Sequence, residues 1–141
     1  MKVACEMRVV VDTNVVAYYL LRTEPFFEEA RDLWHRVEAP IAPSFWAAEY
    51  ANAVWGVARA GVLDPAEALG RLRLAALLGI EEVAVGQLWA GALSRALAAN
   101  HPVYDTLFVE LAEREALPLV TFDQKLIERF PRVAIRPRDL G

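Results

Sequence analysis

The sequence contains few of the residues that build disulfides, zinc sites or membrane spans. Cys5 is the only cysteine among 141 residues, which excludes an intramolecular disulfide and a cysteine-based zinc cluster. The longest apolar stretches, Val15 to Leu21 and Leu74 to Ile80, are far shorter than the roughly 20 residues that span a bilayer. Glu6 and Arg8 interrupt the apolar residues near the N-terminus before a signal-peptide core can form. We therefore expect a cytoplasmic protein without a secretion signal or a membrane span.

Internal repeats, low-complexity tracts and polar linkers are also absent from the sequence, and its length fits one compact domain. Hydrophobic residues make up 56% of the chain and charged residues 24%, which is more apolar than an average soluble domain. The mean hydropathy is +0.24, with four tryptophans. A monomer this small would expose apolar surface, which a second copy can cover. We predict a single domain over residues 1–141 that forms a homodimer.

Positive charge is scarce as well. The formal net charge is −4, which argues against a broadly basic surface for nucleic acid. An acidic metal site would account for part of this balance, since the bound cation offsets its carboxylates. Thirteen of the fifteen basic residues are arginine, a side chain well suited to local phosphate contacts.

Apolar periodicity predicts strands alternating with helices. Strand-like runs cover 8–12, 39–43, 83–85, 117–121 and 133–135. Helical patterns cover 14–22, a segment beginning at 25, 44–60, 64–78, 88–97, 105–116 and 124–130. Such alternation indicates an α/β fold with a mainly parallel sheet covered by helices on both faces, in three α/β/α layers.

Several helix ends carry recognisable signals. Ser44 is suited to cap the helix that follows it, and Asp64-Pro65 with Glu67 forms a capping box. Within the 44–60 helix, Glu49 lies on a face of small residues, so its carboxylate can approach a neighbouring element closely. The other glutamates considered lie in charge-rich stretches where we expect them to be solvated, namely Glu28, Glu29, Glu81, Glu82, Glu113 and Glu115.

Three of the six aspartates remain as candidate site residues once the other three are given structural roles. Of the others, one lies on an amphipathic helix, one is a cap and one is in the tail, namely Asp32, Asp64 and Asp139. Asp12 ends the first strand, Asp123 follows a later strand, and Asp105 heads a helix. These three can meet above the carboxyl edge of a parallel sheet, where such sheets bind ligands. Glu49 completes a predicted quartet.

Each carboxylate also has a purely structural interpretation. Asp12, Asp105 and Asp123 can each cap the helix that follows, and a helical glutamate such as Glu49 usually faces solvent. Gathered in a poorly solvated crevice, however, four carboxylates would repel one another unless a cation compensates. An all-oxygen set fits Mg²⁺, or Mn²⁺ as a substitute, better than Zn²⁺. Such an ion can activate water for hydrolysis of a phosphodiester.

Four segments, in order, resemble the PIN domain and especially the VapC-type toxins. They are Val10-Val-Asp-Thr-Asn-Val15, Ala48-Glu-Tyr-Ala-Asn52, Val103-Tyr-Asp-Thr-Leu107 and Val120-Thr-Phe-Asp123. The resemblance covers nearly the whole chain. It assigns the acidic metal site to Asp12, Glu49, Asp105 and Asp123, with Asn14 and Thr121 in support. Thr106 stands where the family often has alanine.

The resemblance also implies an activity and partners. Members of this family are usually dimeric and cleave RNA endonucleolytically, leaving a 3′-hydroxyl, and VapC-type members are restrained by a small antitoxin. The alternatives are a PIN-type RNA-processing nuclease that is not a toxin, or a receiver-like or scaffold module without catalysis. A signalling receiver domain is disfavoured because Asp12-Thr-Asn14 lacks the adjacent pair of acidic residues expected there. A haloacid-dehalogenase-type phosphatase is disfavoured because Asn14 stands where that family has its second aspartate.

Three further groups have open roles. His35 and His101 fit surface or loop positions, although His101 lies close enough to Asp105 in sequence to touch substrate. The four tryptophans fit core or dimer packing better than base stacking, namely Trp34, Trp46, Trp55 and Trp89. The arginines near the C-terminus suit either RNA or partner contacts or a solvated tail, namely Arg132, Arg136 and Arg138.

Overall fold

The computed structural model describes residues 7–141, so the expectations that involve Cys5 and Glu6 lie outside the described residues. Five parallel strands form one sheet in the order β3-β2-β1-β4-β5. The strands are β1 (Arg8–Val11), β2 (Ala39–Pro43), β3 (Glu81–Val83), β4 (Leu119–Val120) and β5 (Ala134–Ile135). The chain adds β2 and β3 on one side of β1, and β4 and β5 on the other. The strand order thus reverses between β1 and β4, and the carboxyl ends of strands at such a switch point are where open α/β sheets bind ligands.

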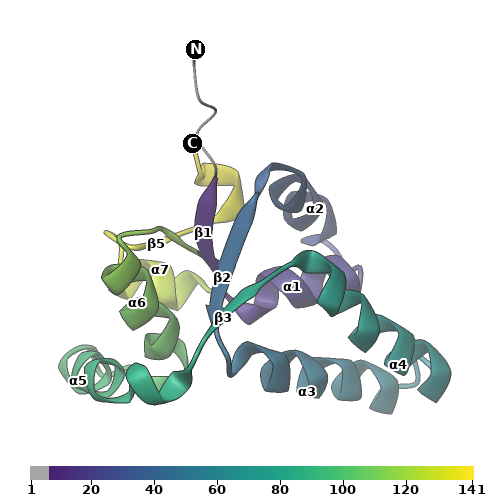
Figure 1. Cartoon of the computed structure of the whole chain (residues 1–141). Coiled ribbons are helices and arrows are strands. Elements are labelled where there is room, and N and C mark those ends of the chain that lie inside the picture. The colour runs from purple at the N-terminus through teal and green to yellow at the C-terminus, as the bar shows by residue number, and fades with distance from the viewer. Residues whose placement is uncertain (1–6) are drawn as a thin grey trace.

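Within residues 7–141, seven α-helices surround the sheet and give the three-layer α/β/α fold that the sequence predicts (Figure 1). In Figure 1, α1 (Thr13–Leu20), α2 (Phe27–Arg36), α3 (Trp46–Arg59) and α4 (Pro65–Leu74) lie to the right of the strands. To the left lie α5 (Trp89–Ala99), α6 (Val103–Glu115) and α7 (Gln124–Arg129). Short 3₁₀ turns complete the chain, namely η1 (Ala75–Leu78), η2 (Val85–Gln87) and η3 (Pro137–Asp139). Among residues 7–141, none of the helices combines the length and apolar character needed to cross a membrane.

Several predicted boundaries are wrong. Ser44 does not cap α3; its amide donates to the Val83 carbonyl oxygen at 2.8 Å and prolongs the β2–β3 pairing. The third strand is β3 rather than 83–85. Helix α6 begins at Val103, with Pro102 in the N-cap position, so Asp105 lies inside the first turn instead of capping it. The capping box of Asp64, in contrast, is confirmed.

The core centres on β1 and α6. The β1 residues Val9, Val10 and Val11 are almost fully buried, because helices cover both faces of this central strand. Helix α6 is buried along the continuous stretch 106–112, including Leu107 and Phe108. Each large apolar side chain buried in this way contributes roughly 1.5–3 kcal/mol to stability. The core therefore fixes the positions of β1, which leads to Asp12, and of α6, which carries Asp105.

Helix α5 packs against α6 through a buried ion cluster. The Glu110 side chain on α6 is 9% exposed, and its oxygens pair with Arg95 Nε at 2.8 Å and Arg114 Nε at 2.6 Å. Gly91 on α5 faces this carboxylate, and a Cβ at that position would overlap it. A larger residue at position 91 would therefore require the Glu110 carboxylate to move from its place beside the arginines.

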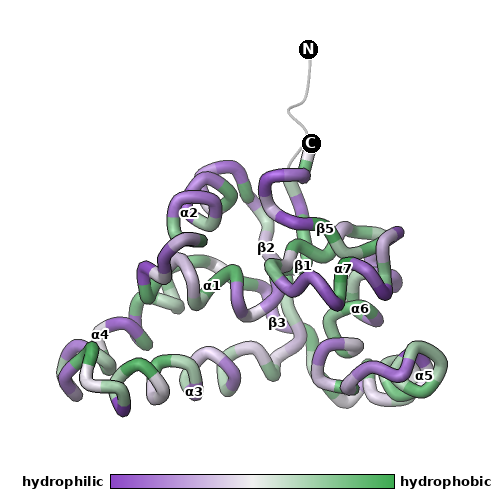
Figure 2. Tube along the Cα trace, turned by 180° about the vertical axis from the view of Figure 1, so that it is seen from behind, coloured by the Kyte–Doolittle hydropathy of each residue, from purple (hydrophilic) through white to green (hydrophobic). Residues whose placement is uncertain are grey.

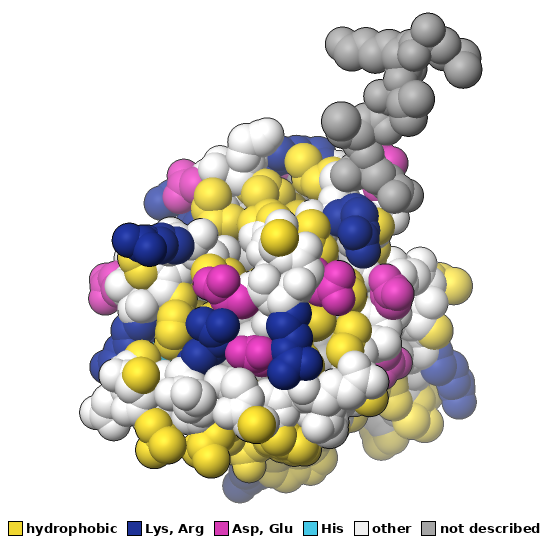
Figure 3. Space-filling view, turned by 60° about the vertical axis from the view of Figure 1, so that its left-hand side comes forward, with side chains coloured by type: hydrophobic (Ala, Val, Ile, Leu, Met, Phe, Trp, Pro, Cys, Tyr) yellow, Lys and Arg dark blue, Asp and Glu magenta, His cyan; other side chains and the backbone are white. Residues whose placement is uncertain are grey.

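Some apolar side chains remain on the surface. On α5, Trp89, Leu93 and Leu97 are spaced one helical turn apart and are 47%, 52% and 75% exposed. Trp55 on α3 is also exposed, so of the expected core or dimer packing, the core role is confirmed for Trp46 and Trp34, and the dimer role stays a prediction for Trp55 and Trp89. Figure 2 shows hydrophobic stretches on both α3 and α5. Figure 3 shows hydrophobic side chains along the lower rim of the molecule.

Candidate functional site

The register of β1 and β4 creates the first half of the site. Val11 is aligned with Val120, so the next residues, Asp12 and Thr121, face each other across the two strand ends. The Thr121 hydroxyl donates to Asp12 Oδ2 at 2.7 Å. Asp12 is only 7% exposed. The sheet itself therefore fixes one carboxylate at the carboxyl edge.

Asn14 connects the two strand ends further. Its amide nitrogen donates to Thr121 Oγ1 at 3.3 Å and to Asp12 Oδ2 at 3.4 Å. Its amide oxygen accepts from the Phe122 main-chain nitrogen at 3.1 Å, and the Asp123 amide donates to Thr121 Oγ1 at 3.0 Å. Asn14 and Thr121 thus orient the residues around them through hydrogen bonds.

Asp12 and Asp123 are helix caps as well as candidate ligands. Asp12 Oδ1 accepts from the Thr13 amide at 2.8 Å. Asp123 Oδ1 accepts from the Lys125 and Leu126 amides at 3.0 and 3.3 Å. In each aspartate the capping bonds use Oδ1, whereas Oδ2 of Asp12 accepts from Thr121 and Asn14. The structural and the chemical interpretations are compatible.

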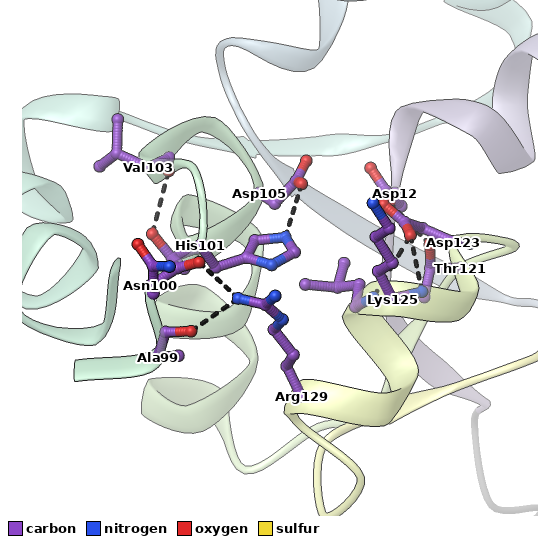
Figure 4. Close-up of polar contacts among 12 residues, drawn as sticks. Asp12, Ala99, Asn100, His101, Val103, Asp105, Thr121, Asp123, Lys125 and Arg129 are labelled. Carbon is purple, nitrogen blue, oxygen red and sulfur yellow. Dashed lines mark hydrogen bonds and ion pairs between the residues drawn. The ribbon is translucent and has the colours of Figure 1, made fainter. Parts of the chain in front are cut away.

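Helices supply the other two carboxylates. Glu49, in the first turn of α3, accepts a 2.7 Å hydrogen bond from the Thr13 hydroxyl. Asp105, in the first turn of α6, has its Oδ2 atom 2.8 Å from His101 Nε2 (Figure 4). His101, Asp105 and Asp123 each offer one ligand atom within 4.8 Å of the others. This spacing would allow a single cation to contact the group.

His101 lies in the loop between α5 and α6, as expected, but it is buried, with 8% of its surface exposed, so the expected surface position is wrong. Its ring lies edge-on to Phe130, with centroids 6.1 Å apart. Arg129 on α7 donates to the main-chain oxygens of Ala99 and Asn100, just before the histidine (Figure 4). Packing and these bonds together hold the His101 ring beside the Asp105 carboxylate.

The carboxylates influence one another electrostatically. Burial, reinforced by the charges of Asp105 and Glu49, raises the pKa of Asp12 to about 7 despite the opposing hydrogen bonds from Thr121 and Thr13. Burial also raises the pKa of Glu49, with Asp105 adding to the effect. For Asp105, burial and then the charge of Asp123 raise the pKa against the opposing influence of His101. The charges of Asp12, Glu49 and Asp105 thus influence one another and Asp123 influences Asp105, while the group whose ligand atoms lie within 4.8 Å contains Asp105 and Asp123 but neither Asp12 nor Glu49.

The chemistry of this donor set fits a divalent cation. A buried carboxyl such as Asp12 carries its charge poorly beside other acids, and a cation would compensate for that charge. The hard oxygen ligands match Mg²⁺ or Mn²⁺. The arrangement can therefore hold such an ion next to a phosphate, while the catalytic roles of the individual residues stay predictions.

Two contributors have weak sequence signals. Thr13 lies between two recognised positions, but only the approach of α3 reveals its bond to Glu49. His101 precedes Asp105 by one helical turn, yet Pro102 between them hides this relation from a periodicity argument. The sequence signal for this contact is the i, i+4 spacing of His101 and Asp105, counted back across the start of α6.

The C-terminal arginines differ from their expected roles. Arg136 pairs with Glu29, with Nη2 3.0 Å from Oε1, and its guanidinium lies over the Phe122 ring at 5.6 Å. The Arg138 amide also donates to Glu29. The expectations that Glu29 is solvated and that Arg136 lies in a solvated tail are therefore wrong, while a contact of these arginines with RNA or a partner stays a prediction.

Comparison with known proteins gives consistent matches. The family model for the PIN domain matches residues 9–134. A ribonuclease VapC3 of Mycobacterium tuberculosis is 32% identical over 124 residues, which cover 88% of each chain. A ribonuclease VapC3 of Pyrobaculum aerophilum is 30% identical over 127 residues, covering 89% of this chain and 96% of that protein.

Solved structures share the fold. PAE2754 from Pyrobaculum aerophilum superposes with a TM-score of 0.70 at 23% identity, covering 94% of this chain and 90% of that one. FitAcB from Neisseria gonorrhoeae gives 0.67 at 19% identity, covering 94% and 99%. A toxin–antitoxin complex from Klebsiella pneumoniae gives 0.64 at 16% identity, with the same coverage.

Proposed function

Since this chain belongs to the PIN-domain family, we propose that it is a magnesium-dependent endoribonuclease and the toxin of a type II toxin–antitoxin pair. The observation that carries the proposal is the grouping of acids at the carboxyl ends of β1 and β4: Asp105 and Asp123 offer ligand atoms within 4.8 Å of each other, and the nearby Asp12 is a buried carboxyl. The ribonuclease names of the relatives support RNA as the substrate. The toxin–antitoxin complex among the structures of the same fold agrees with the regulatory role.

In this proposal the ion is held by the carboxylates of Asp12, Glu49, Asp105 and Asp123, and Mn²⁺ can replace Mg²⁺. When bound, the ion supplies positive charge that activates a water molecule and stabilises the charge developing on the phosphate. Hydrolysis breaks the bond between phosphorus and the 3′ oxygen, so the products end in a 3′-hydroxyl and a 5′-phosphate.

The surrounding side chains keep the carboxylates in place. Thr121 and Asn14 fix Asp12 through its Oδ2 atom, and Thr13 fixes Glu49. His101 donates to Asp105 Oδ2 at 2.8 Å, which restrains that carboxylate. Partners of this kind orient metal ligands and usually affect affinity by about 10- to 100-fold. We assign His101 to positioning because its Nε2 atom is already engaged by Asp105.

An antitoxin partner has a suitable surface between α1, α2 and the end of α4. A groove of about 580 Å³ there combines apolar side chains with arginines, namely Tyr19, Leu20, Arg22, Phe27, Arg31, Arg71, Leu74, Leu77 and Leu78. Leu77 is 80% exposed. The complementary partner is an amphipathic segment with acidic side chains, because these would pair with the arginines while its apolar face covers the leucines.

A homodimer would use a different surface. The exposed row of Trp89, Leu93 and Leu97 on α5 presents apolar area that a second copy can bury. Helix α5, which carries this row, lies on the opposite side of the strands from α2 and α4 (Figure 1). Dimer formation and antitoxin binding are therefore compatible in this proposal. We also propose a cytoplasmic location, where the RNA substrates would be available.

The decisive experiment compares the parent with Asp12→Asn and Asp105→Asn. In purified form with Mg²⁺, we expect each variant to cleave RNA at least about 100-fold more slowly, because a ligand carboxylate is lost. Asp32→Asn is the matched control, since this exposed aspartate lies outside the cluster. EDTA should abolish cleavage by the parent, and Mn²⁺ should restore it.

Expression in cells tests the toxin role separately. Sequencing of RNA 5′ ends after brief expression should reveal new 5′-phosphate ends with the parent and none with Asp12→Asn. Growth arrest with the parent alone would support a toxin. Cleavage of a few precursor RNAs without growth arrest would favour the RNA-processing alternative. Equal cleavage by parent and both aspartate variants would overturn the catalytic assignment.

A further inference from the structure

Two aromatic rings lie together beside the acidic cluster. Phe45 and Tyr104 are stacked, with ring centroids 5.2 Å apart and planes inclined by 13°. Phe45 precedes α3 and lies one helical turn before Glu49, and Tyr104 immediately precedes Asp105 on α6. The stacked pair therefore joins the two helix starts that supply the helical carboxylates.

The position of Tyr104 is not explained by core packing. Its surface is 54% exposed, whereas the following α6 residues 106–112 are buried. Phe45 is half-buried beneath it and supports one face of the tyrosine ring. An aromatic ring held in a fixed orientation and still accessible to solvent can accept another flat group against its free surface.

The charge of the protein favours this kind of contact. With a net charge of −4, the chain has little overall attraction for a polyanion. Stacking of a base on an aromatic ring does not depend on positive charge and tolerates any base, because every base has a π-face. A ring next to Asp105 would thus hold RNA where the surrounding carboxylates repel its phosphates.

We propose that Tyr104, supported by Phe45, is a stacking platform for one unpaired RNA base next to the scissile phosphate. This inference rests on the proposed ribonuclease function. It makes an accessible base face a requirement for productive binding, since both faces of a base inside a duplex are already covered by its neighbours. Tyr104 then contributes to substrate binding, while the carboxylates carry out the chemistry.

The test measures cleavage of a labelled single-stranded oligoribonucleotide by the full chain with Mg²⁺. Tyr104→Ala should raise KM about 10-fold while kcat changes less than about threefold, because a single base–aromatic stack is lost. Tyr104→Trp should restore KM, since it keeps an aromatic face. Trp55→Ala is the matched control: this exposed aromatic on α3 lies about 15 Å along the helix from Phe45.

A substrate with one abasic residue beside the cleavage site provides a second arm. The parent should lose about the same factor on this substrate, and Tyr104→Ala should lose little more, because both changes remove the same contact. If the losses caused by the abasic residue and by Tyr104→Ala multiply, the two changes act independently and the proposed stacking platform is wrong. An unchanged KM in Tyr104→Ala would contradict it as well.

Binding without cleavage separates this inference from the proposed function. In an Asp12→Asn background, Tyr104→Ala should weaken the Kd for the oligonucleotide about 10-fold, measured by fluorescence anisotropy. Equal Kd values would contradict the platform even if the parent is an active ribonuclease. Failure of the parent to cleave any RNA would instead contradict the proposed function.

Discussion

The strand-borne and helix-borne halves of the acidic cluster are held in different ways. Asp12 and Asp123 follow paired parallel strands, and each accepts hydrogen bonds from main-chain amides. Glu49 and Asp105 lie on separate helices, and each is held by one side chain, the Thr13 hydroxyl or the His101 ring. The comparison indicates that sheet register determines one half, whereas helix packing and single side-chain contacts determine the other.

The largest expected effect concerns Asp12 in the metal-free protein. Its pKa is raised from 3.8 to about 7, so the folded state keeps a proton that the unfolded state releases. The resulting stability is fully present below about pH 4 and is lost as the pH rises through about 7. At about 1.4 kcal/mol per pKa unit, the loss amounts to several kcal/mol.

Denaturant unfolding in EDTA from pH 4 to pH 8 measures this effect. Asp12→Asn is the control, because asparagine still caps α1 but does not titrate. We expect the parent to lose stability relative to this variant as the pH rises, and Mg²⁺ to restore it at pH 8. If the stabilities of the parent and of Asp12→Asn change with pH in parallel, the pKa of Asp12 is not raised in the folded protein.

A smaller effect is expected from Thr121→Val, which tests the strand-borne half. The change keeps the side-chain shape but removes the donor to Asp12 and the acceptor for Asp123 and Asn14. We expect the Mn²⁺ affinity and the cleavage rate to fall about 10- to 100-fold, measured by calorimetry and RNA cleavage. Thr23→Val is the control. If Thr13→Val lowers the Mn²⁺ affinity and the cleavage rate as much as Thr121→Val does, the strand-borne and helix-borne halves do not differ in the way proposed.

The smallest effect is expected from His101, which tests the helix-borne half. His101→Gln keeps a donor for Asp105 and should cost less than about threefold in Mn²⁺ affinity. His101→Leu removes the donor from a buried site and should cost about 10-fold. His35→Gln, at an exposed position, should have no effect. If the glutamine and leucine variants lose the same affinity, the histidine acts through packing rather than through its hydrogen bond.

The sequence predicts the strand-borne half well because the information is local. The β-branched run of β1 and the aspartate after it are adjacent in the chain, and parallel pairing then aligns Asp12 with Thr121. The capping box at Asp64 is equally local and is confirmed. Patterns of this kind depend on a few neighbouring residues, so their outcome changes little with tertiary context.

Features that depend on distant residues were not predictable in the same way. Ser44 has the side chain of a helix cap, but its amide is taken by the neighbouring strand. Glu29 and Arg136 are 107 positions apart, so no local pattern indicates their ion pair. His101 is buried because α7 and Phe130 cover it. In each case tertiary packing decides a role that residue type leaves open.

The contact between Gly91 and Glu110 ties a small residue on α5 to the ion pairs of α6. Helix α6 carries both Glu110 and Asp105, and a Cβ at position 91 would overlap the carboxyl end of the Glu110 side chain. The same carboxylate is held by Arg95 on α5 and Arg114 on α6. A larger residue at position 91 would therefore have to displace this carboxylate from its arginines, so a substitution on α5 would be transmitted to α6 little more than one helical turn from Asp105.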